Sequence, residues 1–154
     1  MEKKLYEMMN WPRIEALVYS EEDKPQEILG PHRVRGSILI QTFQPTATAV
    51  TIKVHGTDGA TEYPMEQADE GGFYAALIPG KTVPAYTFLV EYDNGDRQEL
   101  EDSYRFHPQV FGKKDLEAFE QGIHYTIYEK MGAHPMAIDG VDGIYFAVWA
   151  PNAE

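Results

Sequence analysis

The sequence predicts a mainly β protein, an immunoglobulin-like β-sandwich with short N-terminal and C-terminal helices. Six short segments between residues 37 and 101 are predicted strands, and most of them alternate in the direction of their apolar residues, a period of two that is typical of strands with one buried face. Turn residues separate these segments at close spacing. Apolar residues make up 43% of the 154-residue chain, which is enough to build a core. Together these observations favour a sandwich with terminal extensions.

Residues 1–33 are expected to form a helical extension. Helical spacing relates two groups of apolar residues, which are Leu5, Met8 and Met9, then Ile14, Leu17 and Val18. Proline disfavours helix in the residue before it, so Pro12 should separate two short helices near Trp11. A further helical turn is predicted from Asp23 to Gly30, with Pro25 near its start.

The sandwich itself is expected within residues 34–108. Its predicted strands are 37–43, 49–55, 61–65, 73–78, 86–92 and 97–101. Asn94-Gly95 is a typical type I′ turn sequence, and a two-residue turn there would place Tyr92 opposite Arg97 and Leu89 opposite Leu100. Pro64 cannot donate a backbone hydrogen bond, which demotes its strand to a sheet edge.

The remaining chain is predicted to leave this domain. Residues 109–142 are expected to form a linker with one short helix at Lys113–Gln121 and a loop from Gly132 to Gly143. Residues 143–154 then alternate again and are expected to be the first strand of a second, truncated sandwich. Because this strand would have no partner, its exposed edge predicts disorder, folding back, or a strand-mediated dimer.

Composition limits the range of partners. Twenty-five acidic against 13 basic residues give a formal net charge of −12, which disfavours nucleic acid and anionic membranes. No apolar run approaches the length of a membrane-spanning helix, about 20 residues, and the N-terminus lacks the apolar run of a secretory signal. The chain has no cysteine, which fits a reducing compartment, so a cytoplasmic location is expected.

No residue pattern predicts catalysis or metal binding. The neighbouring acids, such as Glu99, Glu101 and Asp102, are expected to be solvated rather than paired across a glycosidic bond. The five histidines form no metal-binding motif, and residues 139–143 lack the acids of a calcium loop and are expected to form a turn. Catalytic residues, metal ligands and cofactors are therefore all predicted to be absent.

Several strings, taken together in their order and spacing, resemble one family. They are residues 28–32 (ILGPH), 46–50 (TATAV), 77–80 (LIPG), 101–106 (EDSYRF), 122–125 (GIHY), 128–134 (YEKMGAH) and 143–153 (GIYFAVWAPNA). In order and spacing, the chain resembles the front end of a bacterial glycogen branching enzyme, a 1,4-α-glucan branching enzyme of the α-amylase superfamily. Ser103 stands where the family usually has proline.

The resemblance implies a layout and a role. It implies an N-terminal sandwich here, a carbohydrate-binding sandwich that starts near Gly143, and a catalytic barrel beyond Glu154. The barrel's catalytic carboxylates have no counterpart in this chain, so the resemblance implies a non-catalytic domain of a glycosyltransferase. Its implied partners are α-1,4-glucan, such as glycogen or maltooligosaccharides, and the enzyme's remaining domains.

Aromatic side chains are the candidate sugar contacts, because a flat ring can lie against the apolar face of a glucose unit. Tyr63, Tyr74 and Tyr92 alternate away from the expected core positions and are the predicted glucan-binding residues. We expect weak glucan binding or tuning of the transferred chain length. The alternatives are a structural spacer that touches no sugar, or the equivalent domain of a debranching or trehalose-forming enzyme.

Overall fold

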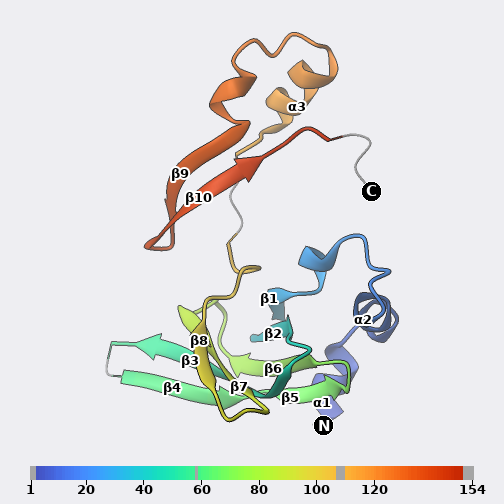
Figure 1. Cartoon of the computed structure of the whole chain (residues 1–154), viewed down its shortest axis with the longest axis vertical. Coiled ribbons are helices and arrows are strands. Elements are labelled where there is room, and N and C mark those ends of the chain that lie inside the picture. Colours follow the sequence, from blue (N-terminus) through green and yellow to red (C-terminus); the bar gives the residue numbers. More distant parts are fainter. Residues whose placement is uncertain (1–2, 58, 107–109, 151–154) are drawn as a thin grey trace. The chain divides into compact units, whose positions relative to one another are not determined.

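The computed structural model describes residues 3–57, 59–106 and 110–150. The chain divides into two compact units, unit 1 from Met1 to Arg105 and unit 2 from Phe106 to Glu154 (Figure 1). The division falls after Arg105, three residues before the expected end of the sandwich at residue 108.

Unit 1 is a sandwich of two four-stranded antiparallel sheets, which confirms the predicted mainly β fold. One sheet has the strand order β1-β2-β6-β5 and the other has the order β4-β3-β7-β8. The helical elements are α1 (Lys3–Met8), α2 (Trp11–Val18) and the 3₁₀ turn η1 (Pro25–Glu27). The strands are β1 (Gly30–Val34), β2 (Ser37–Phe43), β3 (Ala47–Gly56), β4 (Gly59–Pro64), β5 (Glu66–Asp69), β6 (Phe73–Pro79), β7 (Tyr86–Tyr92) and β8 (Arg97–Leu100).

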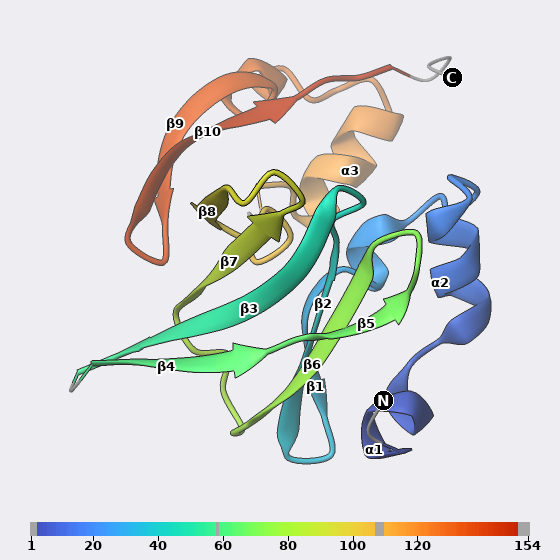
Figure 2. The ribbon, with the colours of Figure 1, turned by 60° about the horizontal axis from the view of Figure 1, so that its bottom comes forward.

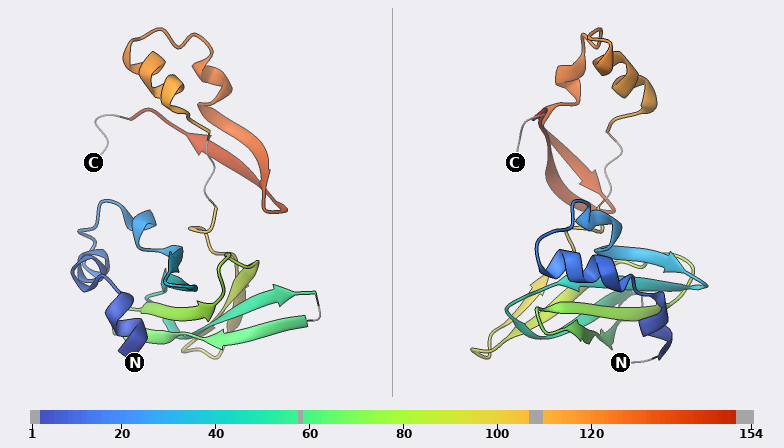
Figure 3. Two further views of the ribbon diagram at one scale, coloured as in Figure 1. Left: turned by 180° about the vertical axis from the view of Figure 1, so that it is seen from behind. Right: turned by 90° about the vertical axis from the view of Figure 1, so that its right-hand side faces the viewer.

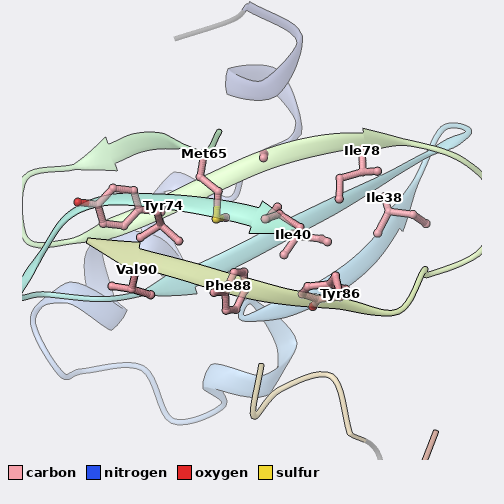
Figure 4. Packing of buried hydrophobic residues seen from close by; sticks show 11 residues of the cluster. Ile38, Ile40, Met65, Tyr74, Ile78, Tyr86, Phe88 and Val90 are labelled. Atoms are coloured by element: carbon pink, nitrogen blue, oxygen red, sulfur yellow. The ribbon is translucent and has the colours of Figure 1, made fainter. Parts of the chain in front are cut away.

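The main core lies between the two sheets. Ile38 and Ile40 of β2 pack in one buried cluster with Ile52 of β3 and with Phe88 and Val90 of β7 (Figure 4). Each of these side chains is buried, and each comes from the face that the alternation of its strand predicted.

A second core covers the other face of the β1-β2-β6-β5 sheet. Leu39, Phe73 and Ala75 point to that face and pack in a cluster with the helical residues Leu5 and Ile14. The views of Figures 2 and 3 show α1 and α2 beside this sheet. Strands β2 and β6 are therefore buried on both faces, which their alternating pattern alone did not indicate.

Two strands of unit 1 were not predicted. β1 lies at a sheet edge, where it pairs with β2, and an edge tolerates the missing N–H of Pro31. β5 follows β4 after a crossing between sheets, and Met65 enters the main core at that crossing. The region expected to be purely helical, residues 1–33, thus contributes most of a strand.

The hairpin prediction at Asn94-Gly95 was wrong by one residue. Leu89 lies opposite Glu99, and Tyr92 donates its backbone N–H to Asp96 O at 3.0 Å. The loop therefore has three residues, and of these only Gly95 takes a positive φ, of 84°. This corresponds to a type I turn closed by a left-handed glycine rather than a type I′ turn.

Unit 2 contains α3 (Lys113–Glu120), the 3₁₀ turn η2 (Ile127–Glu129), and a hairpin of β9 (Gly132–Ile138) and β10 (Val141–Ala147). The predicted helix is confirmed, but the predicted loop before Gly143 and the unpaired strand after it were wrong. Asp139 and Gly140, both at positive φ, form a two-residue turn that pairs Ile138 with Val141. Each strand of this hairpin still has one outer edge, so the strand-mediated dimer stays a prediction.

Candidate functional site

Tyr74 cannot serve as the predicted sugar platform. Its side chain is only 2% exposed and lies inside the main core, and its hydroxyl donates to Ala47 O at 2.8 Å. Burial raises the pKa of this phenol. The prediction failed because the helices cover the opposite face of β6, so both faces of the strand are interior. Tyr74 and Tyr92 also lie in different sheets rather than on adjacent strands.

Tyr63 and Tyr92 are half-buried, with part of each ring packed against the main core. Tyr63 lines a hollow of about 130 Å³ beside Leu5, which is smaller than a typical ligand cavity of about 300 Å³ or more. Ile52 of β3 pairs with Tyr63 on one side and with Phe88 on the other, so Tyr63 and Phe88 lie at the same height in the sheet. Tyr92 lies four residues after Phe88 on β7. Four residues span about 13 Å along a strand, so the two rings do not form one platform.

Tyr6 of α1 and Trp11 of α2 form an aromatic pair in unit 1, in which Tyr6 is exposed and Trp11 is half-buried. Their ring centroids lie 4.7 Å apart at an interplanar angle of 32°. The indole Nε1 of Trp11 donates to Tyr6 O at 3.0 Å, which fixes the tryptophan against the end of α1. Trp11 also packs against the helical core, whereas Tyr6 is 55% exposed. Sequence reasoning missed this pair, although the Trp11-Pro12 helix break was visible.

The segment after α2 is tied back to the same helix. The Arg13 guanidinium donates to Glu22 Oε1 at 2.6 Å and Oε2 at 2.9 Å, and to Glu27 Oε2 at 2.9 Å. The Arg13 contact, helped by the Lys24 backbone N–H, lowers the pKa of Glu22 to about 2. These contacts hold residues 22–27 beside α2, the helix that begins at Trp11.

The buried carboxylate of Asp102 anchors the segment that follows β8 at the end of unit 1. Asp102 is 3% exposed, accepts a hydrogen bond from Tyr86 Oη at 2.5 Å, and accepts another from the Tyr104 backbone N–H at 2.9 Å. Burial, followed by the Asp102 charge, raises the pKa of Tyr86 well above its usual range. Arg105 donates to Tyr86 O at 2.8 Å and lies over its ring. The expectation that Asp102 is solvated was therefore wrong.

Asp115 organises unit 2 in a similar way. Its carboxylate accepts hydrogen bonds from Lys130 Nζ at 2.6 Å and the Gly112 backbone N–H at 2.8 Å, and contacts His124 Nε2 at 2.9 Å. These three contacts, with Lys130 the largest, hold the pKa of Asp115 well below its usual range. The cluster joins the start of α3 to the turns that precede β9.

Among residues 3–57, 59–106 and 110–150, no three histidine, aspartate or glutamate side chains are grouped as a metal site would require. In the same described residues, no helix has the length and apolar character needed to cross a membrane.

A family model described as the N-terminal domain of α-1,4-glucan branching enzyme GlgB matches residues 10–104. The chain belongs to this family. The match to the branching-enzyme N-terminal domain includes Trp11 and runs through all eight strands of unit 1 to Tyr104, whereas Tyr6 lies before it.

Full-length relatives carry the same name. The chain is 41% identical over 140 residues to 1,4-alpha-glucan branching enzyme GlgB 1 of Streptomyces coelicolor, covering 90% of this chain and 17% of that protein. It is 40% identical over 139 residues to the Paramagnetospirillum magneticum enzyme, covering 90% and 18%. It is 42% identical over 143 residues to the Gloeobacter violaceus enzyme, covering 91% and 19%. The chain thus spans less than a fifth of the length of these relatives.

Among solved structures, the chain is similar to two pullulanases. A pullulanase of Anoxybacillus sp. LM18-11 complexed with maltotriose is 23% identical with a TM-score of 0.43, over 48% of this chain and 11% of that one. The type I pullulanase of Bacillus subtilis complexed with maltose is 24% identical with a TM-score of 0.42, over 48% and 10%.

Proposed function

We propose that this chain is the non-catalytic N-terminal domain of a 1,4-α-glucan branching enzyme, and that it holds α-1,4-glucan weakly during glycogen synthesis. The match to the branching-enzyme N-terminal family supports the assignment of the parent enzyme. The Tyr6–Trp11 pair is the observation that carries the sugar contact, because its exposed ring, Tyr6, stands beside a half-buried tryptophan that is held in place by a hydrogen bond and by the helical core. This pair replaces Tyr74 in the proposed site. Tyr63 and Tyr92 are second candidates, through the exposed part of each ring.

The expected affinity is low. One glucose face on one ring removes about 100 Å² of apolar surface, worth roughly 2–3 kcal/mol at about 25 cal/mol per Å². Association entropy opposes binding by at least about 4 kcal/mol, so hydrogen bonds to sugar hydroxyls must supply the remainder. A dissociation constant of about 1 mM or weaker follows. Weak contact suits a domain that guides a long glucan chain and so influences the length of chain that is transferred.

An NMR titration of the labelled chain with maltoheptaose tests the sugar contact. Shifts should cluster around Tyr6 and Trp11 and should be lost in Tyr6→Ala. Tyr19→Ala is the matched control, because Tyr19 is a 70% exposed tyrosine on unit 1 without a neighbouring ring among the described residues. Chemical-shift changes that survive Tyr6→Ala would reject this site. The absence of any shift at a maltoheptaose concentration about ten times the expected dissociation constant would reject it as well.

The second candidate is a structural spacer. It is favoured by the way the three predicted tyrosines contribute to the main core instead of standing free of it. A spacer would leave the maltoheptaose titration blank while truncation of the domain still lowers the stability of the whole enzyme. Debranching and trehalose-forming parents are less favoured, because the three relatives described above are named as branching enzymes.

The lack of catalysis has its own test. The chain should add no branch points to amylose, as followed by iodine absorbance and by reducing ends after debranching. A protein-dependent rise in branch points would contradict the non-catalytic assignment.

A further inference from the structure

One end of the β1-β2-β6-β5 sheet carries an open hollow of about 310 Å³. Three cationic side chains, Arg33, Arg35 and Lys81, line it together with Gly36 and Ser37. The volume lies at the lower end of the range for small-molecule sites, about 300 to 1,000 Å³. The hollow is separate from the Tyr6–Trp11 pair.

Strand register explains why these residues meet. Val34 lies opposite Ser37 across β1 and β2, and Ser37 lies opposite Pro79 across β2 and β6. The β1–β2 turn and the segment that starts after Pro79 therefore emerge side by side at the same end of the sheet (Figure 2). Residues more than 40 positions apart in the sequence are brought to one rim by this pairing.

The three cations are unusual in so acidic a chain. The net charge is −12, and most basic side chains of unit 1 have carboxylate partners, such as Glu22 for Arg13 and Glu99 for Lys53. No hydrogen bond or ion pair joins the side chain of Arg33, Arg35 or Lys81 to any residue that the structure describes. Like charges gathered without partners repel one another, which lowers the stability of the folded state.

Arg35 also occupies an unfavourable backbone conformation. Its φ is 42° and that of Gly36 is 83°, so the two residues form a type I′ turn that favours asparagine or glycine. A side chain other than glycine, asparagine or aspartate pays a conformational penalty in the left-handed region. Strain of this kind is often retained where a residue serves a ligand.

We propose that this hollow binds the phosphate monoester of a sugar. A phosphate carries a charge of about −1.5 to −2 at pH 7, which the guanidinium groups and the ammonium can neutralise. The volume leaves room for a sugar-sized body beside the phosphate. The lining has no aromatic ring on which a nucleobase could stack, which disfavours nucleotides. The phosphate monoester can belong to a free sugar phosphate or to a phosphorylated unit of a glucan.

Calorimetric titration of the chain with glucose 6-phosphate at low ionic strength is the test. Binding at about millimolar affinity is expected, with weakening as salt is added. Glucose should not bind at this site, and inorganic phosphate should bind more weakly. A maltooligosaccharide phosphorylated on one unit, titrated into the Tyr6→Ala variant, distinguishes the two sources, because tighter binding than glucose 6-phosphate in that variant assigns the hollow to glucan. Equal affinity for inorganic phosphate and glucose 6-phosphate would overturn the sugar part of the proposal.

Two substitutions locate the site, and one serves as a control. Arg35→Asn suits the left-handed turn, so it should keep or raise the melting temperature while weakening binding at least about fivefold. Lys81→Gln should weaken binding similarly. Lys4→Gln removes the same charge from α1 and should leave the affinity unchanged. Unchanged affinity in both Arg35→Asn and Lys81→Gln, or an equal loss in Lys4→Gln, would overturn the proposal.

Discussion

The hydrogen bond between Tyr86 and Asp102 offers the sharpest test of how the segment after β8 stabilises unit 1. Tyr86→Phe removes only the hydroxyl and retains the ring, which packs edge-on against Phe88 at a centroid distance of 5.6 Å. Asp102 is 3% exposed and also accepts a hydrogen bond from the Tyr104 backbone N–H, which the substitution does not touch. The substitution therefore isolates one hydrogen bond to a buried carboxylate.

The expected cost follows from the character of that bond. A hydrogen bond to a charged group contributes about 1.5–3 kcal/mol, so Tyr86→Phe should lower the free energy of unfolding of unit 1 by about 2 kcal/mol. For a unit of this size, that corresponds to a fall in melting temperature of about 8 °C. The double variant with Asp102→Asn should lose less than the sum of the two single variants, because both remove the same bond.

Urea unfolding followed by Trp11 fluorescence measures this cost. A Trp149→Phe background restricts the signal to unit 1, since Trp11 and Trp149 are the two tryptophans of the chain. Tyr19→Phe is the control, because Tyr19 is exposed and should tolerate loss of its hydroxyl without change. A loss below about 0.5 kcal/mol in Tyr86→Phe, or full additivity in the double variant, would refute the reasoning.

Two further predictions concern backbone geometry and pH. An added Cβ at Gly72, where φ is 102°, would lie 2.4 Å from Pro45 Cα, so Gly72→Ala should cost more than about 3 kcal/mol. Gly95→Ala has a similar positive φ but open space around it and should cost about 1–2 kcal/mol, and equal melting temperatures of the two variants would contradict this. Because the folded-state pKa of Asp115 is depressed, its stabilisation of unit 2 should be complete above its unfolded pKa of about 4 and should be lost as the pH falls toward the folded value. NMR signals of α3 followed from pH 6 to pH 2 measure this loss, and Asp115→Asn should remove the acid-dependent part; an unchanged pH profile in that variant would contradict the assignment.

The sequence predicted the sandwich because alternation is a local signal. Ile38 and Leu39 are neighbours on β2, so their side chains point to opposite faces of the sheet and pack in different cores. The burial of Tyr74 was not predictable from alternation, because both faces of β6 are buried: Tyr74 packs between the two sheets, whereas Phe73 and Ala75 pack against the helices. Residues that alternate away from one core were therefore mistaken for surface residues.

Turn chemistry limited the remaining predictions. Asn94-Gly95 suits both a two-residue and a three-residue loop, and only the conformation of Asn94 distinguishes them. β9 contains Pro135 and several small side chains, which weaken its strand signal, and its residues were predicted to form a loop although Asp139-Gly140 is a strong hairpin signal. The proposed sugar site was missed because Tyr6 and Trp11 meet only after the chain turns between α1 and α2.

Affinity electrophoresis of the chain in native gels tests the central claim most directly. The account predicts that glycogen in the gel retards the wild-type chain, that dextran of similar concentration does not, and that Tyr6→Ala restores the mobility seen without glycogen. Equal mobility of the wild-type chain in glycogen and dextran gels would contradict the claim that this domain holds α-1,4-glucan.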